Sequence, residues 1–189
     1  DTVVWYENVL DTNKMWIPHI MTENSDFAKS AIAVDLDGDT DIDIAYPSQN
    51  NCIEWKEKTN STKWHTHYID NVEDGTSFVI HSDIDRDGDH DILSASGFKD
   101  KIVWHENLLN EGSGWLTHNV TTSANDVDCI GTADIDNDGD SDVFAALYRN
   151  GNIKWYENRT NKNDDWVKHT VTTNAGRPIF VDSFDIDED

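Results

Sequence analysis

The chain contains very little cysteine, proline and positive charge. Its 189 residues include two Cys, three Pro and 14 Lys or Arg against 38 Asp or Glu, which gives a formal net charge of −24. Two cysteines cannot form the disulfide framework of a small secreted domain, and the sequence does not decide whether Cys52 and Cys129 pair. The excess of negative charge excludes nucleic acid and anionic membrane surfaces as partners, because both would repel the chain.

Long hydrophobic runs and helical periodicity are also missing. No stretch approaches the roughly 20 apolar residues of a transmembrane helix, so we expect no membrane insertion. No segment has an apolar stripe with the 3.6-residue period of a helix. Strong acidity would fit disorder, but eight Trp, five Tyr and six Phe are enough rings for a packed core.

Three sequence markers recur four times in the same order. The first is Trp-x-Glu, mostly followed by Asn, and it is centred on Trp5, Trp55, Trp104 and Trp155. The second is Trp-x-x-His, which pairs Trp16 with His19, Trp64 with His67, Trp115 with His118 and Trp166 with His169. The third is an aspartate-rich loop that begins at Asp35, Asp83, Asp134 and Asp185. Equivalent positions lie 48 to 51 residues apart, so the chain is an internal repeat.

The segments around these markers have the period of β-strands. Residues 78–81 enter an aspartate loop, residues 91–95 leave it, and residues 101–105 and 115–121 alternate with period two. Gly, Asn and Ser clusters separate these segments, as expected of turns. The predicted fold is therefore all-β, with four-stranded antiparallel blade repeats of about 50 residues packed as a β-propeller or a propeller-like array. The approximate units are 1–24 (partial), 25–74, 75–123, 124–174 and 175–189 (partial).

Residues 33–44, Ala-Val-Asp-Leu-Asp-Gly-Asp-Thr-Asp-Ile-Asp-Ile, together with the Trp-x-Glu-Asn strand, resemble the VCBS/FG-GAP repeat family. The resemblance extends over essentially the whole chain. It implies β-propeller blades that bind calcium in the loop between their first and second strands. Proteins of this family are mostly secreted or on the cell surface, where they serve adhesion, glycan binding or surface assembly.

Each complete aspartate loop has Asp at its positions 1, 3, 5, 7 and 9. Five carboxylates so close together repel one another strongly unless a cation compensates them, and calcium accepts six to eight oxygen ligands at flexible geometry. Magnesium is less suitable because it requires strict octahedral geometry. Zinc and copper are less suitable because they prefer His and Cys ligands, and His90 is the only His or Cys in the complete loops. An EF-hand is rejected because position 12 is Tyr46, Ser94 or Ala145 in place of Glu. In the pattern of such loops, positions 1, 3, 5 and 9 supply carboxylates and position 7 a backbone carbonyl.

The sequence thus predicts three full calcium sites and one partial site. The candidate ligands are Asp35, Asp37, Asp39, Asp41 and Asp43; Asp83, Asp85, Asp87, Asp89 and Asp91; Asp134, Asp136, Asp138, Asp140 and Asp142; and, in the partial site, Asp185, Asp187 and Asp189. Position 6 requires a positive φ, which Gly88 and Gly139 supply, whereas the first loop has the β-branched Thr40 there. We therefore expect the first site to be the weakest or to fold differently.

No catalytic motif is present, and the histidines recur once per unit, so we predict structural histidines and no enzymatic activity. Three Asn-x-Ser/Thr sequons, at Asn60, Asn119 and Asn158, are candidate glycosylation sites. The chain ends within the fourth aspartate loop, so we interpret it as part of a longer array.

The function expected from these features is that of an extracellular or cell-surface, secreted calcium-binding repeat protein with an adhesive, recognition or structural-assembly role. Its expected partners are an extracellular protein, a glycan or further copies of itself. The first alternative is a lectin with sugar sites at a Trp-rich blade rim. The second is a calcium-dependent polysaccharide-active enzyme.

Overall fold

The computed structural model describes residues 2–9, 15–23, 28–48, 52–60, 63–69, 75–109, 114–159 and 166–184. These residues contain fourteen β-strands and no α-helix, and all strand pairings are antiparallel. The prediction of an all-β fold is confirmed. Among the described residues there is also no helix with the length and apolar character needed to cross a lipid bilayer.

The strands form one hairpin followed by three four-stranded sheets in which each strand pairs with its neighbours in sequence. The hairpin consists of β1 (Val3–Val9) and β2 (Met15–Thr22). The first sheet contains β3 (Ile32–Val34), β4 (Asp43–Ser48), β5 (Cys52–Asn60) and β6 (Lys63–Ile69). The second contains β7 (Thr76–Ser82), β8 (Asp91–Ser96), β9 (Lys101–Leu108) and β10 (Gly114–Thr121). The third contains β11 (Val127–Ala133), β12 (Asp142–Leu147), β13 (Asn152–Glu157) and β14 (Val167–Thr172). The four-stranded antiparallel repeat expected from the sequence is thus present three times.

The second strand of each four-stranded sheet is buried along its whole length. All six residues of β4, β8 and β12 are buried, which fits the small and apolar residues that these segments contain. A strand buried on both faces must contribute to two cores at once. In β8, Ile92 belongs to the core shared with the preceding sheet, and its neighbour Leu93 belongs to the core shared with the following one.

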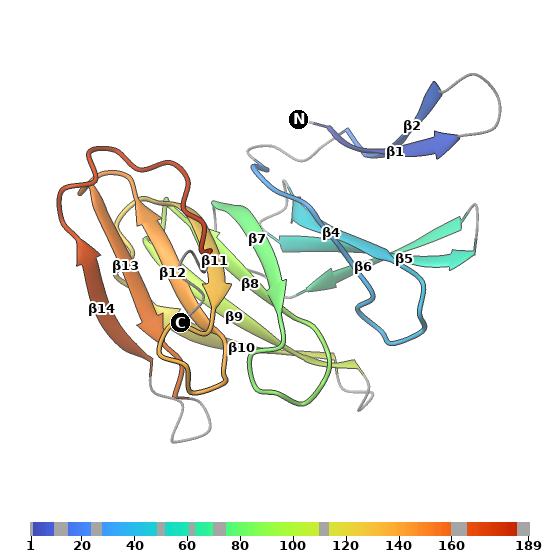
Figure 1. Cartoon of the computed structure of the whole chain (residues 1–189). Helices are drawn as coiled ribbons and strands as arrows, with labels where there is room; N and C mark the ends of the chain where they lie inside the picture. Colours follow the sequence, from blue (N-terminus) through green and yellow to red (C-terminus); the bar gives the residue numbers. More distant parts are fainter. Residues whose placement is uncertain are drawn as a thin grey trace.

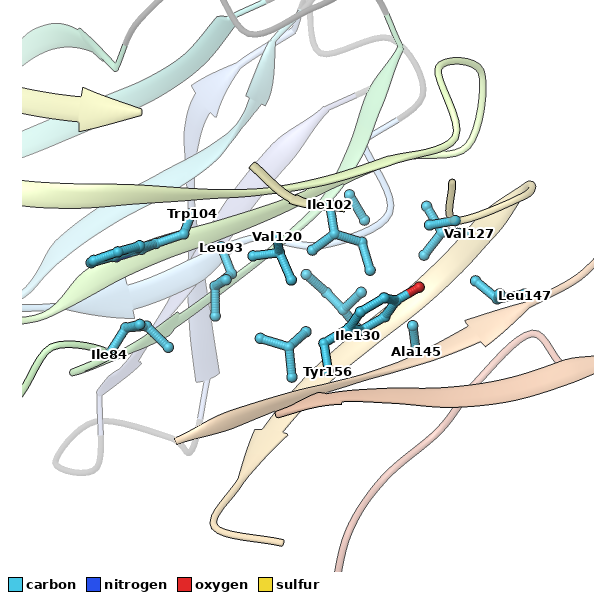
Figure 2. Close-up of a cluster of buried hydrophobic side chains, with 13 residues drawn as sticks. Ile84, Leu93, Ile102, Trp104, Val120, Val127, Ile130, Ala145, Leu147 and Tyr156 are labelled. Atoms are coloured by element: carbon cyan, nitrogen blue, oxygen red, sulfur yellow. The ribbon is translucent and has the colours of Figure 1, made fainter. Parts of the chain in front are cut away.

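The two hydrophobic cores lie between successive sheets. One core joins the first and second sheets, with Trp55 of β5 packed edge-on against Trp115 of β10 at a ring distance of 6.5 Å. The other joins the second and third sheets, where Leu93 and Trp104 of the second sheet belong to one cluster with Ile130 and Tyr156 of the third (Figure 2). No sheet has a core of its own, so each repeat depends on its neighbours for stability.

Successive sheets follow one another in chain order across the molecule (Figure 1). Strand β7 connects the three sheets, because it contacts β3 and β4 of the preceding sheet and β11 of the following one. Packing of this kind is used by propellers and by open arrays alike. Closure into a propeller ring stays a prediction.

Candidate metal centre

Each aspartate loop connects the first and second strands of a sheet. We call residues 35–43 loop 1, residues 83–91 loop 2 and residues 134–142 loop 3, which join β3 to β4, β7 to β8 and β11 to β12. The fourth aspartate segment, with Asp185, Asp187 and Asp189, lies outside the described residues.

The aspartate at position 9 closes each loop. In loop 2, Asp91 accepts a hydrogen bond from the Ile84 N–H at 3.0 Å with one oxygen and from the Asn107 N–H at 2.8 Å with the other. Asp43 and Asp142 accept the corresponding pairs of backbone N–H groups in loops 1 and 3. This carboxylate therefore fixes the two ends of the loop to each other and to the third strand of the sheet.

Two residues of each loop have left-handed backbone conformations. At position 6, φ is 77° for Thr40, 98° for Gly88 and 92° for Gly139, as the sequence predicts for this position. Position 4 is also left-handed in all three loops, and this was not predicted where Arg86 or Asn137 occupies it. Thr40 thus adopts the same turn as the two glycines, at the steric cost of a β-branched side chain in this region. Loop 1 is therefore not folded differently at position 6.

Replacing Thr40 with Gly is expected to relieve this strain and to strengthen calcium binding at loop 1. A gain of about 1 kcal/mol corresponds to roughly a fivefold increase in affinity. Calorimetric titration with calcium measures the change. Thr170→Gly on exposed β14 is the control, because it removes a threonine side chain away from the loops. Unchanged or weaker affinity of the Thr40→Gly protein would contradict the role assigned to this turn.

The loop side chains bring three carboxylates together in each loop. In loop 2, one oxygen from each of Asp83, Asp85 and Asp91 lies within 4.8 Å of the others. The same positions, 1, 3 and 9, converge in loop 3, with Asp134, Asp136 and Asp142. In loop 1 the converging carboxylates are Asp35, Asp37 and Asp39, from positions 1, 3 and 5. Carboxylate oxygens are the type of ligand that calcium prefers.

The carboxylates at position 7 of loops 1 and 3 face basic side chains. Lys58 donates a hydrogen bond to Asp41 at 3.0 Å in loop 1, and Arg86 of loop 2 forms an ion pair with Asp140 of loop 3 at 3.0 Å. Arg86 also approaches Asp138 at 3.6 Å. The side chains of Asp41 and Asp140 are thereby held outside the clusters of three, which fits the expectation that position 7 offers its backbone carbonyl.

Burial raises the pKa of several loop carboxyl groups. It raises the pKa of Asp91 to about 7, although the N–H groups of Asn107 and Ile84 partly offset the effect. Burial also raises the pKa of Asp37, Asp43, Asp85 and Asp142, and neighbouring carboxylates add to the shift. The loops thus gather more negative charge than their own hydrogen bonds compensate, and a bound cation would reverse these shifts.

Asp83 provides a direct indication that a metal ion fits. Its Oδ1 is shielded from solvent and has no hydrogen-bond partner among the described residues. A buried carboxylate oxygen without a partner is costly, and coordination to a cation would remove that cost. The donor set, which consists of oxygen atoms alone, fits calcium better than zinc or copper.

The asparagine of the Trp-x-Glu-Asn marker connects consecutive loops. The Asn107 side chain donates to the carbonyl of Leu36 in loop 1 at 2.8 Å and to that of His90 in loop 2 at 3.1 Å. Asn158 repeats this arrangement one unit later, with Ile84 of loop 2 and Ser141 of loop 3. The sequence showed that this asparagine recurs, but the bond to the preceding loop spans more than 70 residues and could not be inferred from spacing.

The other marker residues form a stacked pair with a carboxylate. In the second sheet His118 stacks on Trp104 with ring centroids 4.3 Å apart, and its Nε2 lies 2.6 Å from Glu106. The same Trp–His–Glu arrangement is present in the hairpin and in the other two sheets. The recurring histidines are therefore structural, as the sequence predicted, and the recurrence of Glu two residues after Trp was the signal for their partner.

The comparison with known families identifies one part of the chain. Residues 83–145, from the start of loop 2 to the middle of β12, match the family model of the FG-GAP-like repeat. This segment is similar to an FG-GAP-like repeat. The match includes both loops whose carboxylates converge at positions 1, 3 and 9, together with the Trp104 and Trp115 markers. No curated protein matches the chain.

The structure also bears on the glycosylation sequons and on the two cysteines. Asn158 is fully buried and its amide donates two hydrogen bonds, so this sequon is not accessible to a glycosyl transferase. Asn60 and Asn119 are exposed and stay predictions. Cys52 and Cys129 are both buried as free thiols, and they belong to different sheets.

Proposed function

We propose that this chain is a calcium-stabilised repeat protein with a non-enzymatic role in extracellular adhesion, recognition or assembly. The observation that carries the proposal is the convergence of three carboxylates in each of three loops, together with the buried and unpartnered oxygen of Asp83. Calcium bound there is structural. It neutralises a loop that joins two strands and that also contacts the next repeat.

The FG-GAP-like repeat at residues 83–145 supports the recognition role, because modules of this kind present a rigid surface built from repeated sheets. The lectin alternative has less support. Of the eight tryptophans only Trp16 is exposed, at 59%, and the others are buried or half-buried. An exposed platform of Trp rings, on which sugars commonly stack, is therefore restricted to the hairpin.

Asp85→Asn is expected to abolish calcium binding at loop 2 and to leave loops 1 and 3 intact. The amide oxygen still accepts the hydrogen bond that Asp85 receives from the Asp87 N–H, so the loop backbone is preserved while one charged ligand is lost. The number of calcium ions bound per chain, measured by calorimetric titration, should decrease by one.

Glu23→Gln is the matched control, because Glu23 is exposed and lies outside the loops. It removes the same charge and should leave the stoichiometry unchanged. If the wild-type chain binds no calcium, or if Asp85→Asn binds as many ions as the wild type, the proposed function is wrong.

A further inference from the structure

A second kind of metal-ligand cluster lies on the first sheet, outside the aspartate loops. It consists of Glu57 on β5 and of His65 and His67 on β6, and one donor atom from each residue lies within 4.8 Å of the others. The Glu57 Oε2 atom is 2.5 Å from His67 Nε2 and 3.6 Å from His65 Nδ1. Two imidazoles therefore face the same carboxylate oxygen.

The backbone fixes this arrangement. Glu57 and His65 are directly opposite each other on adjacent antiparallel strands, and His67 is two residues further along β6 on the same face of the sheet. His67 is further restrained because it stacks on Trp55 at a ring distance of 4.3 Å. Two of the three side chains are thus held in place before any ligand binds, as a metal site requires.

His65 departs from the repeat. The other three units have an apolar residue at its position between Trp and His, namely Ile17, Leu116 and Val167. The other units have the Trp–His–Glu arrangement as well, but only this one adds a second imidazole beside the carboxylate. The structural role of the repeated histidine does not explain His65.

Two imidazole nitrogens and one carboxylate oxygen form a donor set suited to zinc. Zinc bonds of 2.0–2.2 Å in a tetrahedron place ligand atoms about 3.3 Å apart, between the two distances that are present, so small side-chain movements suffice. The His65 side chain is 69% exposed and that of Glu57 is 23% exposed, which leaves an open approach and a fourth position for water. Calcium is not suited to this cluster because it prefers oxygen ligands alone.

We infer that Glu57, His65 and His67 form a binding site for a divalent transition-metal cation of the zinc class, separate from the calcium loops. The site does not depend on the proposed calcium function, because it shares no ligand with the loops. It gives the first sheet a property that the second and third sheets do not share.

The test is calorimetric titration of the full chain with zinc in the presence of saturating calcium, which occupies the aspartate loops. We expect the wild type to bind one zinc ion, and His65→Leu to bind it at least 10- to 100-fold more weakly. Leucine is the residue found at the equivalent position of the second sheet, so this variant restores the pattern of the other repeats and should fold. Cobalt in place of zinc should give the visible absorption of a tetrahedral site, which His65→Leu should lose.

Leu116→His provides a gain-of-function test on the second sheet. Leu116 lies opposite Glu106 and is 49% exposed, and His118 already contacts Glu106 at 2.6 Å. The variant should therefore bind a second zinc ion. The inference is overturned if the calcium-saturated wild type binds no zinc, if His65→Leu binds it equally well, or if Leu116→His gains no site. None of these outcomes depends on whether calcium occupies the loops, so the two proposals can fail separately.

Discussion

Removal of calcium by excess chelator is expected to lower the midpoint of thermal unfolding by about 20 °C. An ion present at 100 times its dissociation constant stabilises a folded protein by about 2.7 kcal/mol per site, and three loops would contribute about 8 kcal/mol together. For a chain of this length 1 kcal/mol corresponds to about 2–4 °C. Circular dichroism or scanning calorimetry measures the shift.

Thermal unfolding measured over a range of pH separates the effect of bound calcium from general effects of charge. In the metal-free protein burial raises the pKa of Asp91 to about 7, so the folded state binds a proton that the unfolded state does not bind near neutral pH. Metal-free stability should therefore increase as the pH falls from about 8 towards 5. With calcium bound the carboxylate is held in its charged form, and this gain should disappear.

Addition of calcium after chelation should restore the original midpoint, whereas an equal concentration of magnesium should restore little of it. A midpoint that chelator leaves unchanged would show that the loops are stable without metal. The proposed structural role would then be wrong.

Asn107→Ala is expected to destabilise the chain by about 2–4 kcal/mol. The buried side chain donates to the Leu36 and His90 carbonyls and accepts from the Leu109 N–H, so the substitution removes three hydrogen bonds and leaves buried polar groups without them. Because one of these bonds reaches loop 1, calcium binding at loop 1 should weaken as well. Chemical denaturation and calcium titration measure the two effects.

Asn8 provides a control within the same sequence marker. It occupies the equivalent position in the hairpin, where it is exposed, so Asn8→Ala should change the stability by less than about 0.5 kcal/mol. Equal effects of the two substitutions would show that Asn107 acts through its own strand alone, and the proposed link between loops would be refuted.

The repeat architecture followed from the sequence because its signals are local. The period-two alternation predicted the strands on either side of the aspartate loops, and the glycines predicted the left-handed turn at position 6. The placement of each loop between the first and second strands was implied by the resemblance to the VCBS/FG-GAP repeat family. The recurrence of His19, His67, His118 and His169 at the same repeat position also predicted a structural role, which agrees with the stacking of His118 on Trp104.

Contacts between repeats could not be predicted in the same way. The ion pair of Arg86 with Asp140 and the bond from Asn107 to Leu36 join residues that are far apart in sequence, and their geometry depends on how two sheets pack. The role of Asp43, Asp91 and Asp142 in closing the loops was missed for a different reason: the residues are close in sequence, but the spacing of the aspartates does not show which carboxylates accept backbone N–H groups. The cluster around His65 was missed because the cross-strand register places Glu57 beside it.

The hydrogen bonds that Asn107 and Asn158 make between loops all run in one direction along the chain, from a later repeat to an earlier loop. Asn107 holds loop 1 and Asn158 holds loop 2, so both of these loops receive this support from the repeat that follows them in the chain. A ribosome releases the chain from its N-terminus, and a loop therefore leaves the exit tunnel some seventy residues before the side chain that secures it. We therefore expect the newest repeat on a nascent chain to be the least secure, and folding during synthesis to advance one repeat behind translation.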